Sequence, residues 1–310
     1  MTNLLPQSAM ADVILRREAL AAGYNDRDIR KMVRSGLWHR IRHGAYVGAQ
    51  AWNELSDVDQ HALLARAVLR QARAEMVLSH ISALPEYDAP MWGLPRDVVH
   101  VTRRDGRAGR KESGVSQHQG LLLPADVEVR RDVEVTSATR TAIDITKLAD
   151  TERSLVVVNH LLHHKHTTLE AMRARYSTMD RHPFTLHTDL VLRLADPRIE
   201  SVGESRTFFL CWSQGLPVPE PQFTVTDPRT GEVVRLDFAW PEHGVWLEFD
   251  GKEKYVKYLR EGETVAEAVI REKRREDRIR ELTGWRCIRI TWADLFHPER
   301  TAARVRAMLA

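Results

Sequence analysis

The sequence predicts an α+β protein of several domains: a winged helix-turn-helix at the start, a mixed α/β middle and an α/β/α domain at the end. The length of 310 residues, 43% of them hydrophobic, allows two or three domains with cores of their own. The first segment has the order helix, turn, basic helix and hairpin. The last third has the order helix, three strands, helix and strand. The expected domains are 1–55, 56–180 and 199–310.

Composition indicates a cytoplasmic protein that does not span a membrane. No run of 18 apolar residues exists, and the N-terminus lacks the pattern of a secretory signal. Cys211 and Cys287 are too few and too distant for a disulfide framework or a zinc motif. The net charge of +3 is small, but residues 1–50 contain eight Lys and Arg against four Asp and Glu.

The first segment predicts two helices and a hairpin. Ala11–Ala22 has the apolar spacing of an amphipathic helix that ends at Gly23. A second helix is expected over Asp26–Ser35, with Asn25 as its N-cap. Leu37–Val47 is expected to form a short basic hairpin.

This order is that of a winged helix-turn-helix, in which the second helix enters the DNA major groove and the hairpin contacts phosphates. Six cationic residues would contact duplex DNA: Arg27, Arg30, Lys31, Arg34, Arg40 and Arg42. The alternative is that these charges only solvate a small helical domain. The attached hairpin favours DNA contact.

The stretch EALAAGYNDRDIRKMVRSGLWHRIRHGAYV resembles the N-terminal domain of AbiEi-type antitoxins from type IV toxin–antitoxin systems. The stretch VEVTSATRTAIDITKL resembles the central region of the same proteins and extends the resemblance to about residue 150. It implies DNA binding, commonly for autorepression. Candidate partners are therefore duplex DNA, a cognate toxin and a second copy of the chain, with no membrane.

The middle segment predicts helices and strands without evident chemistry. Helices are expected over Asp57–Ala74, Glu75–Leu84, Thr136–Leu148, Thr151–His164 and Thr167–Met179, with strands over Asp97–Thr102, Val115–Gln119 and Val127–Val135 and a linker over Asp180–Pro197. The basic segment Arg103–Gly114 either crosses a phosphate backbone or is a solvated loop, and the second is favoured. Arg140 has no assigned role. His160 and His164 favour a polar helix face over a metal site.

The last domain centres on a predicted hairpin of Val233–Trp240 and Val245–Asp250, joined by a four-residue turn. A symmetric turn pairs Trp240 with Val245 and Phe238 with Leu247. It places Leu236, Phe238, Leu247 and Phe249 on one face, and Asp237, Glu248 and Asp250 on the other. Carboxylates directly opposite one another lie about 5 Å apart and repel. A divalent cation would make them a binding site.

The stretches LDFAWPE, WLEFDG and REKRREDRIRELTGWRCIRIT resemble the PD-(D/E)xK nuclease superfamily, closest to its very-short-patch-repair-like group, over about Glu200 to Leu309. This implies a restriction-endonuclease-like α/β/α fold in which Asp237 and Glu248 bind Mg²⁺, with Glu204 and Asp250 as further ligands. The superfamily motif has lysine where Asp250 stands, so Lys252 or Lys254 would supply the catalytic charge. The alternative for Asp250 is an ion pair with Arg235.

Two functions follow from these patterns. In the first, the bound Mg²⁺ lowers the pKa of a water that hydrolyses a DNA phosphodiester bond, in defence or repair. In the second, the chain is an AbiEi-like antitoxin and autorepressor, and its last domain is a degenerate platform for a partner. The displaced lysine favours the second, and the two retained carboxylates favour the first. A third function, that of a nucleotidyltransferase toxin, is set aside because the sequence lacks the motif of that class. Cations of the helix over Ala266–Leu282 are mostly expected to form i,i+4 pairs.

Overall fold

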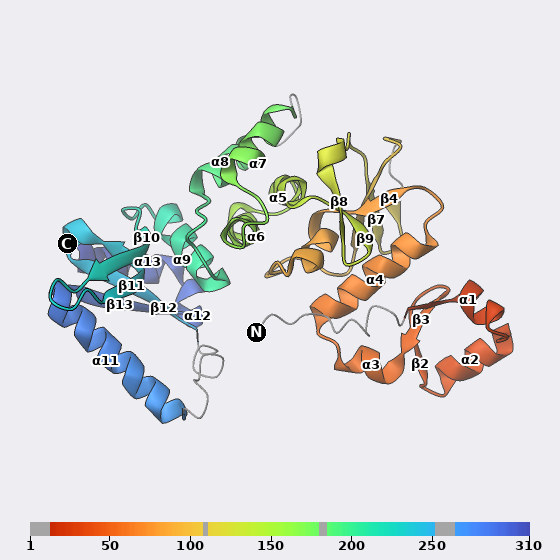
Figure 1. Ribbon diagram of the computed structural model, residues 1–310, viewed down its shortest axis with the longest axis horizontal. Helices are drawn as coiled ribbons and strands as arrows, with labels where there is room; N and C mark the ends of the chain where they lie inside the picture. Colours follow the sequence, from red (N-terminus) through yellow and green to blue (C-terminus); the bar gives the residue numbers. More distant parts are fainter. Residues whose placement is uncertain (1–12, 108–110, 180–184, 252–263) are drawn as a thin grey trace. The chain divides into compact units, whose positions relative to one another are not determined.

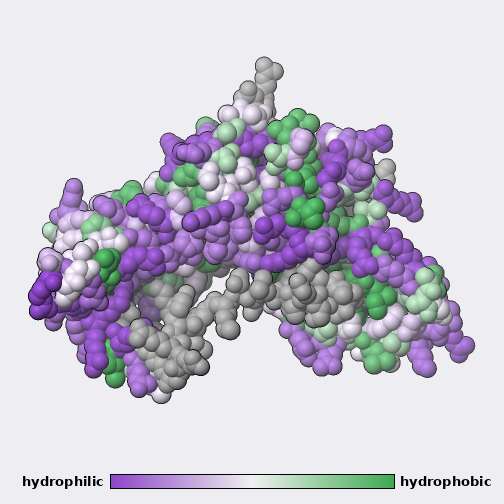
Figure 2. Space-filling view, in the orientation of Figure 1, coloured by the Kyte–Doolittle hydropathy of each residue, from purple (hydrophilic) through white to green (hydrophobic). Residues whose placement is uncertain are grey.

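The computed structural model describes residues 13–107, 111–179, 185–251 and 264–310 (Figure 1). The chain divides into unit 1, Met1–Leu194, and unit 2, Ala195–Ala310. Unit 1 contains both the winged-helix segment and the middle segment that the sequence separates at residue 55. The described helices include none long and apolar enough to span a bilayer. The face drawn in Figure 2 is mostly hydrophilic, with scattered hydrophobic residues.

Unit 1 begins with the predicted order of helix, turn, helix and hairpin. The elements are β1 (Ile14–Leu15), α1 (Arg16–Ala21), α2 (Asp26–Arg34), β2 (Trp38–Arg42), β3 (Ala45–Gly48) and α3 (Ala49–Glu54). The helix predicted over Ala11–Ala22 begins only at Arg16. Ile14 and Leu15 instead pair antiparallel with Tyr46 and Ala45 of β3, because the extended pairing buries these apolar side chains against the hairpin.

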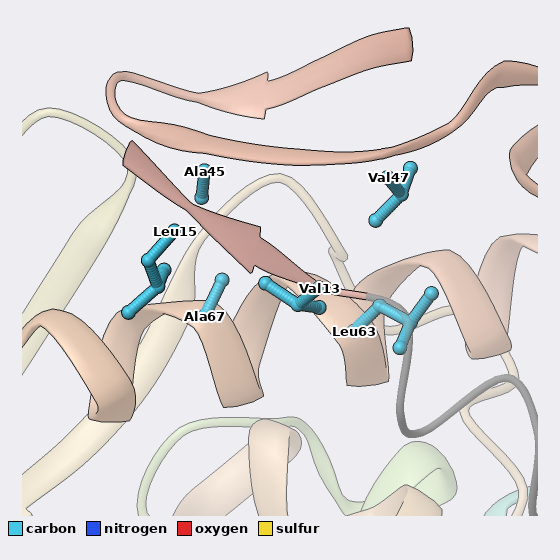
Figure 3. Packing of buried hydrophobic residues seen from close by; sticks show 6 residues of the cluster. All are labelled: Val13, Leu15, Ala45, Val47, Leu63 and Ala67. Atoms are coloured by element: carbon cyan, nitrogen blue, oxygen red, sulfur yellow. The ribbon is translucent and has the colours of Figure 1, made fainter. Parts of the chain in front are cut away.

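Helix α4 (Asp57–Gln71) completes the core of the winged helix (Figure 3). Leu63 and Ala67 of α4 pack against Val13 and Leu15 on one strand and against Ala45 and Val47 on β3. The helix predicted over Asp57–Ala74 is confirmed, and it ends at Gln71. Because α4 leads directly into the sheet that follows, one helix belongs to both parts of unit 1.

A six-stranded sheet forms the middle of unit 1, in the order β6-β7-β5-β4-β9-β8. Its strands are β4 (Met76–Leu78), β5 (Val99–Arg103), β6 (Lys111–Glu112), β7 (Val115–His118), β8 (Val127–Arg130) and β9 (Val133–Thr136). The strands predicted over Asp97–Thr102 and Val115–Gln119 are present, but the single strand predicted over Val127–Val135 is two antiparallel strands, β8 and β9, joined by a turn at Arg131 and Asp132. The helix predicted over Glu75–Leu84 is wrong, because Met76–Leu78 pairs with β5 and β9, and a 3₁₀ helix, η2, follows over His80–Tyr87.

Four helices complete unit 1: α5 (Ala138–Thr146), α6 (Thr151–His163), α7 (Leu169–Ser177) and α8 (Thr185–Leu194). The first three follow the predicted ranges. Helix α8 lies where the sequence predicted a linker. Its buried Val191 and Leu192, together with the Thr188 hydroxyl bonded to Thr146 at 2.7 Å, show why this segment is ordered against α5.

Unit 2 has the predicted order of helix, three strands, helix and strand. Its elements are α9 (Val202–Ser213), β10 (Glu220–Thr226), β11 (Val233–Trp240), β12 (Val245–Asp250), α11 (Val265–Thr283), β13 (Arg286–Thr291), α12 (Trp292–Leu295) and α13 (Pro298–Leu309). The sheet order is β10-β11-β12-β13, and only β12 and β13 run parallel. The predicted pairs Trp240 with Val245 and Phe238 with Leu247 are confirmed.

Strand β11 loses its regular alternation of side chains at Asp237. Phe238 packs against Phe208 of α9, at a ring-centroid distance of 6.3 Å. Leu236 instead belongs to a buried cluster with Ala239 and with Ile279 of α11. The prediction that Leu236 and Phe238 share one face is therefore wrong. The paired registers on both sides of β11 omit Asp237, so the strand is irregular at this residue.

Candidate nucleic-acid interface and the carboxylates of unit 2

Helix α2 presents four cations along one face. Arg27, Arg30, Lys31 and Arg34 follow the spacing i, i+3, i+4, i+7, which aligns side chains on one side of an α-helix. All four are exposed, and within the described residues no ion pair or side-chain hydrogen bond engages them. The opposite face buries Ile29. The cationic face is therefore free to meet an anionic ligand.

The N-terminus of α2 is fixed by its predicted cap. The Asn25 side chain accepts hydrogen bonds from the amides of Arg27 and Asp28, at 2.9 and 3.1 Å. The Asp28 carboxylate accepts one from the Asn25 amide at 3.0 Å, which completes a capping box. This part of the prediction is confirmed. The cap determines where α2 begins and hence which side its cations take.

The turn of the hairpin is anchored to helix α4. Gln71 donates from Nε2 to the His43 carbonyl at 3.0 Å, and the Arg16 amide donates to the Gly44 carbonyl at 2.9 Å. Gly44 has φ +73°, a conformation that favours glycine. Of the two predicted hairpin contacts, Arg40 is exposed and Arg42 is half-buried beside a register shift between them.

A second anchor joins the winged helix to α4 through Arg70. Its guanidinium donates to the Val13 carbonyl and to a Glu18 carboxylate oxygen, both at 2.6 Å. Burial opposes the charged form of Glu18. The Leu15 amide and Arg70 outweigh it, so the pKa of Glu18 is lowered and the carboxylate stays ionised. The first elements of the winged helix and α4 are thus held together by these polar contacts as well as by their common hydrophobic core.

The four predicted carboxylates of unit 2 all have protein partners. Asp237 accepts from the Phe249 amide at 2.8 Å, so its side chain bonds the neighbouring strand where the regular pairing stops. Glu248 is 7% exposed, and an oxygen lies 3.3 Å from the Arg275 guanidinium. An oxygen of Asp250 lies 3.8 Å from Arg289. The alternative pair between Asp250 and Arg235 is wrong, because Arg235 pairs with Glu200 at 2.7 Å.

Glu204 is buried at the start of α9 and forms a capping network. It accepts from the Glu200 amide at 3.1 Å, from the Ser201 hydroxyl at 2.7 Å and from Gln222 at 2.9 Å. Gln222 has φ +53°. Its neighbours in β10, Pro221 and Phe223, pair with the two residues on either side of Asp237. Gln222 was not among the predicted site residues. Its link from Glu204 to the strand beside Asp237 depends on the positive φ of Gln222, which no local pattern indicates.

In the described part of the chain, each of these four carboxylates is engaged by protein groups of its own. Within the described residues, no three His, Cys, Asp or Glu side chains are grouped so that they could hold a metal ion. Lys252 and Lys254, the predicted catalytic cations, lie outside the described residues. Mg²⁺ binding by Asp237, Glu248, Glu204 and Asp250 therefore stays a prediction.

Arg140, to which the sequence assigned no role, lies in a buried charge network. It is 4% exposed and donates to Asp144 at 2.8 Å, to Asp126 at 3.1 Å and to the Leu121 carbonyl at 2.9 Å. Arg175 donates to both oxygens of Asp126 at 2.7 Å. Arg140 and Arg175 thus hold α5 and α7 against the segment that contains Leu121 and Asp126.

Three histidines form a further cluster that was not predicted from the sequence. The rings of His80 and His118 stack at a centroid distance of 3.7 Å, and Nδ1 of His100 lies 2.8 Å from Nε2 of His118. Burial lowers the pKa of His80 to about 3 and that of His100 to about 4, so both are neutral at pH 7. His100 and His118 lie on two strands that the sequence predicted, so their positions could have indicated part of this cluster. The third member, His80, lies on η2, which the sequence did not predict.

Known proteins resemble parts of this chain. Residues 8–47 match a family described as a transcriptional regulator, AbiEi antitoxin. Two uncharacterized proteins of Mycobacterium tuberculosis, from strains CDC 1551 and H37Rv, are each 33% identical over 116 residues. The match covers 37% of this chain and only 39% of the length of those relatives. The family match supports the resemblance stated for the first segment and falls on the helices and hairpin that carry the exposed cations.

Proposed function

We propose that this chain is a DNA-binding transcriptional regulator of the AbiEi antitoxin type. The observation that carries the proposal is the face of α2, where four exposed cations form no ion pair or side-chain hydrogen bond within the described residues. The segment that matches the antitoxin family contains this face. A purely solvating role is less favoured, because Asp26, the acidic residue four positions before Arg30, is already paired with Arg16 at 2.7 Å.

In this proposal α2 enters the major groove with its cationic face toward the DNA. Arginine can pair bidentately with guanine, and arginine and lysine both contact phosphates. Arg40, exposed on β2, contacts the adjacent backbone. The anchored turn at His43 and Gly44 keeps this strand at a fixed position relative to α2, so little conformational entropy is lost on binding. A cognate toxin is a further proposed partner, and it follows from the family alone.

The test measures duplex binding by fluorescence anisotropy at salt concentrations from roughly 50 to 200 mM. Wild type should bind with a steep salt dependence, and Arg30→Ala with Arg34→Ala should weaken binding and reduce the slope by about 1 for each phosphate that is no longer contacted. The matched control is Arg173→Ala with Arg193→Ala, which removes the same charge from exposed positions of α7 and α8 in unit 1. Salt-independent binding, or equally weakened binding by both variants, would refute groove docking by α2.

Hydrolysis of DNA by unit 2 is the second candidate function, and it rests on the irregular strand at Asp237. There one carboxylate bonds the strand that carries Glu248, and Gln222 links the same place to Glu204. The test incubates plasmid with Mg²⁺ and either wild type or Glu248→Ala. Cleavage by wild type only would support hydrolysis. Cleavage by both proteins, or by neither, would leave unit 2 as a non-catalytic domain.

A further inference from the structure

A basic cavity lies beside the wing in unit 1, outside the cations of α2. It has a volume of about 480 Å³. Its walls come from the end of β2, the end of α4 and the strands β4, β5 and β7. Four arginines line it: Arg42, Arg73, Arg103 and Arg107. No acidic residue is among its described lining residues, which include Gln71 and Gln117 as further hydrogen-bond donors.

The charge of this cavity is only partly compensated by the protein. Asp105 accepts from Arg103 at 2.8 Å and lies 3.9 Å from Arg107, so one carboxylate serves two guanidinium groups. Arg73 is exposed, and among the described residues it has no ion-pair or hydrogen-bond partner. Several arginines facing one cavity repel one another, and this arrangement is favourable once an anion binds between them.

Helix α4 fixes the position of the cavity relative to the wing. The residues of α4 that line the cavity all lie near its C-terminal end. Its last turn supplies Val68 and Gln71, and Gln71 also holds the turn of the wing through the His43 carbonyl. Arg73 follows two residues later. Arg42 comes from the wing itself, so the cavity is continuous with the proposed DNA-binding surface.

We propose that this cavity binds a phosphate of the DNA backbone, so that Arg73, Arg103 and Arg107 extend the DNA contact from the winged helix onto the middle sheet. The inference rests on the proposed function. A duplex carries one phosphate per roughly 3.4 Å of each strand, so a backbone held at Arg42 presents further phosphates to the adjacent arginines. Guanidinium groups suit such oxygens, because they donate two parallel hydrogen bonds.

The basic segment after β5 acquires a role in this way. The sequence left open whether Arg103–Gly114 crosses a phosphate backbone or is a solvated loop. The Arg103 side chain donates to Asp105 at 2.8 Å and the Arg107 backbone amide donates to the same carboxylate at 3.2 Å, and both arginines line the cavity. A segment held in this way loses less conformational entropy than a solvated loop when a phosphate binds.

The experiment uses the full chain and a short mixed-sequence duplex, and it measures binding affinity against salt concentration. Arg73→Ala with Arg107→Ala should reduce the logarithmic salt slope by about 0.9 for each phosphate that the variant no longer neutralises, which corresponds to about an eightfold weaker affinity per phosphate at 0.1 M salt. The control Arg173→Ala with Arg193→Ala removes the same charge from exposed residues of α7 and α8 that do not line the cavity and should leave the slope close to wild type.

Two further arms separate the outcomes. If wild type shows no salt-dependent binding, the proposed function fails and the inference fails with it. If the α2 variant loses affinity while the cavity variant matches its control, only the inference is overturned. Calorimetry with inorganic phosphate distinguishes the source of the anion. Phosphate binding that the cavity variant loses, together with an unchanged DNA slope, would identify a site for a free anion and overturn the DNA proposal.

Discussion

The ion pair between Arg66 and Glu86 provides a strong test of how unit 1 is assembled. Arg66 on α4 donates from Nη2 to both oxygens of Glu86 on η2, at 2.8 and 2.7 Å. The side chains are 8% and 0% exposed. Arg66 also donates to the Arg131 carbonyl at 3.0 Å. This pair therefore connects α4, which also packs on the winged helix, to η2 in the middle of unit 1.

Replacing Arg66 with alanine leaves a carboxylate buried without its cation. Removing one partner of such a pair typically costs about 3–5 kcal/mol, because the remaining charge is neither solvated nor paired. Arg66→Ala should therefore lower the free energy of unfolding by about this amount at pH 7. The double variant Arg66→Met with Glu86→Leu should recover most of this stability, since it removes both charges and preserves volume.

The destabilisation should depend on pH in a defined direction. Burial raises the pKa of Glu86 despite Arg66, and removing Arg66 raises it further. A carboxyl whose pKa is higher in the folded state contributes stability at low pH and loses it as pH rises through that value. The deficit of Arg66→Ala should therefore shrink as the pH falls toward the range where Glu86 is protonated.

Urea denaturation followed by circular dichroism measures these differences, with Arg96→Ala as the control. Arg96 pairs with Asp57 at 3.1 Å on the surface of the same unit, and such exposed pairs contribute at most about 1 kcal/mol. A destabilisation in Arg66→Ala no greater than that in the control would refute the reasoning. A deficit that grows toward low pH would refute its electrostatic part.

Two other predictions follow from close packing and from buried titratable groups. A Cβ at Gly203 would lie 2.0 Å from the Phe249 ring, so Gly203→Ala should destabilise unit 2 by about 1–3 kcal/mol, and an unchanged urea midpoint would contradict the packing of α9 on β12. The lowered pKa values of His80 and His100 mean that the folded state binds fewer protons than the unfolded state, so stability should be full above about pH 6.5 and decline as pH falls. In an NMR titration both rings should remain neutral at pH 6, and a titration step between pH 6 and 7 would contradict their burial.

The local patterns of the sequence predicted much of the fold. The cap at Asn25, the helix that follows it and the turn between Trp240 and Val245 all depend on residues within a few positions of one another. The errors occur where a distant partner outweighs local preference. Ile14 and Leu15 form a strand because β3 is beside them, and Met76–Leu78 forms one because β5 and β9 are.

The candidate sites divide in the same way. The cationic face of α2 is a property of spacing along one helix, so the sequence alone identifies Arg27, Arg30, Lys31 and Arg34. The cavity beside the wing gathers side chains from β2, β5 and the end of α4, and no local pattern indicates that they meet. The link from Glu204 through Gln222 toward Asp237 likewise depends on the positive φ of Gln222 in β10.

The sequence by itself determined the order of elements in unit 2, the two faces of α2 and the pairing of Phe238 and Trp240 with the next strand. Only the tertiary structure decided that α4 belongs to both parts of unit 1, that Arg140 is buried among carboxylates, and that Glu248 lies against Arg275. The physical reason is that helix and strand periods fix which side a residue faces. The partner on that side is chosen by packing between segments far apart in the chain.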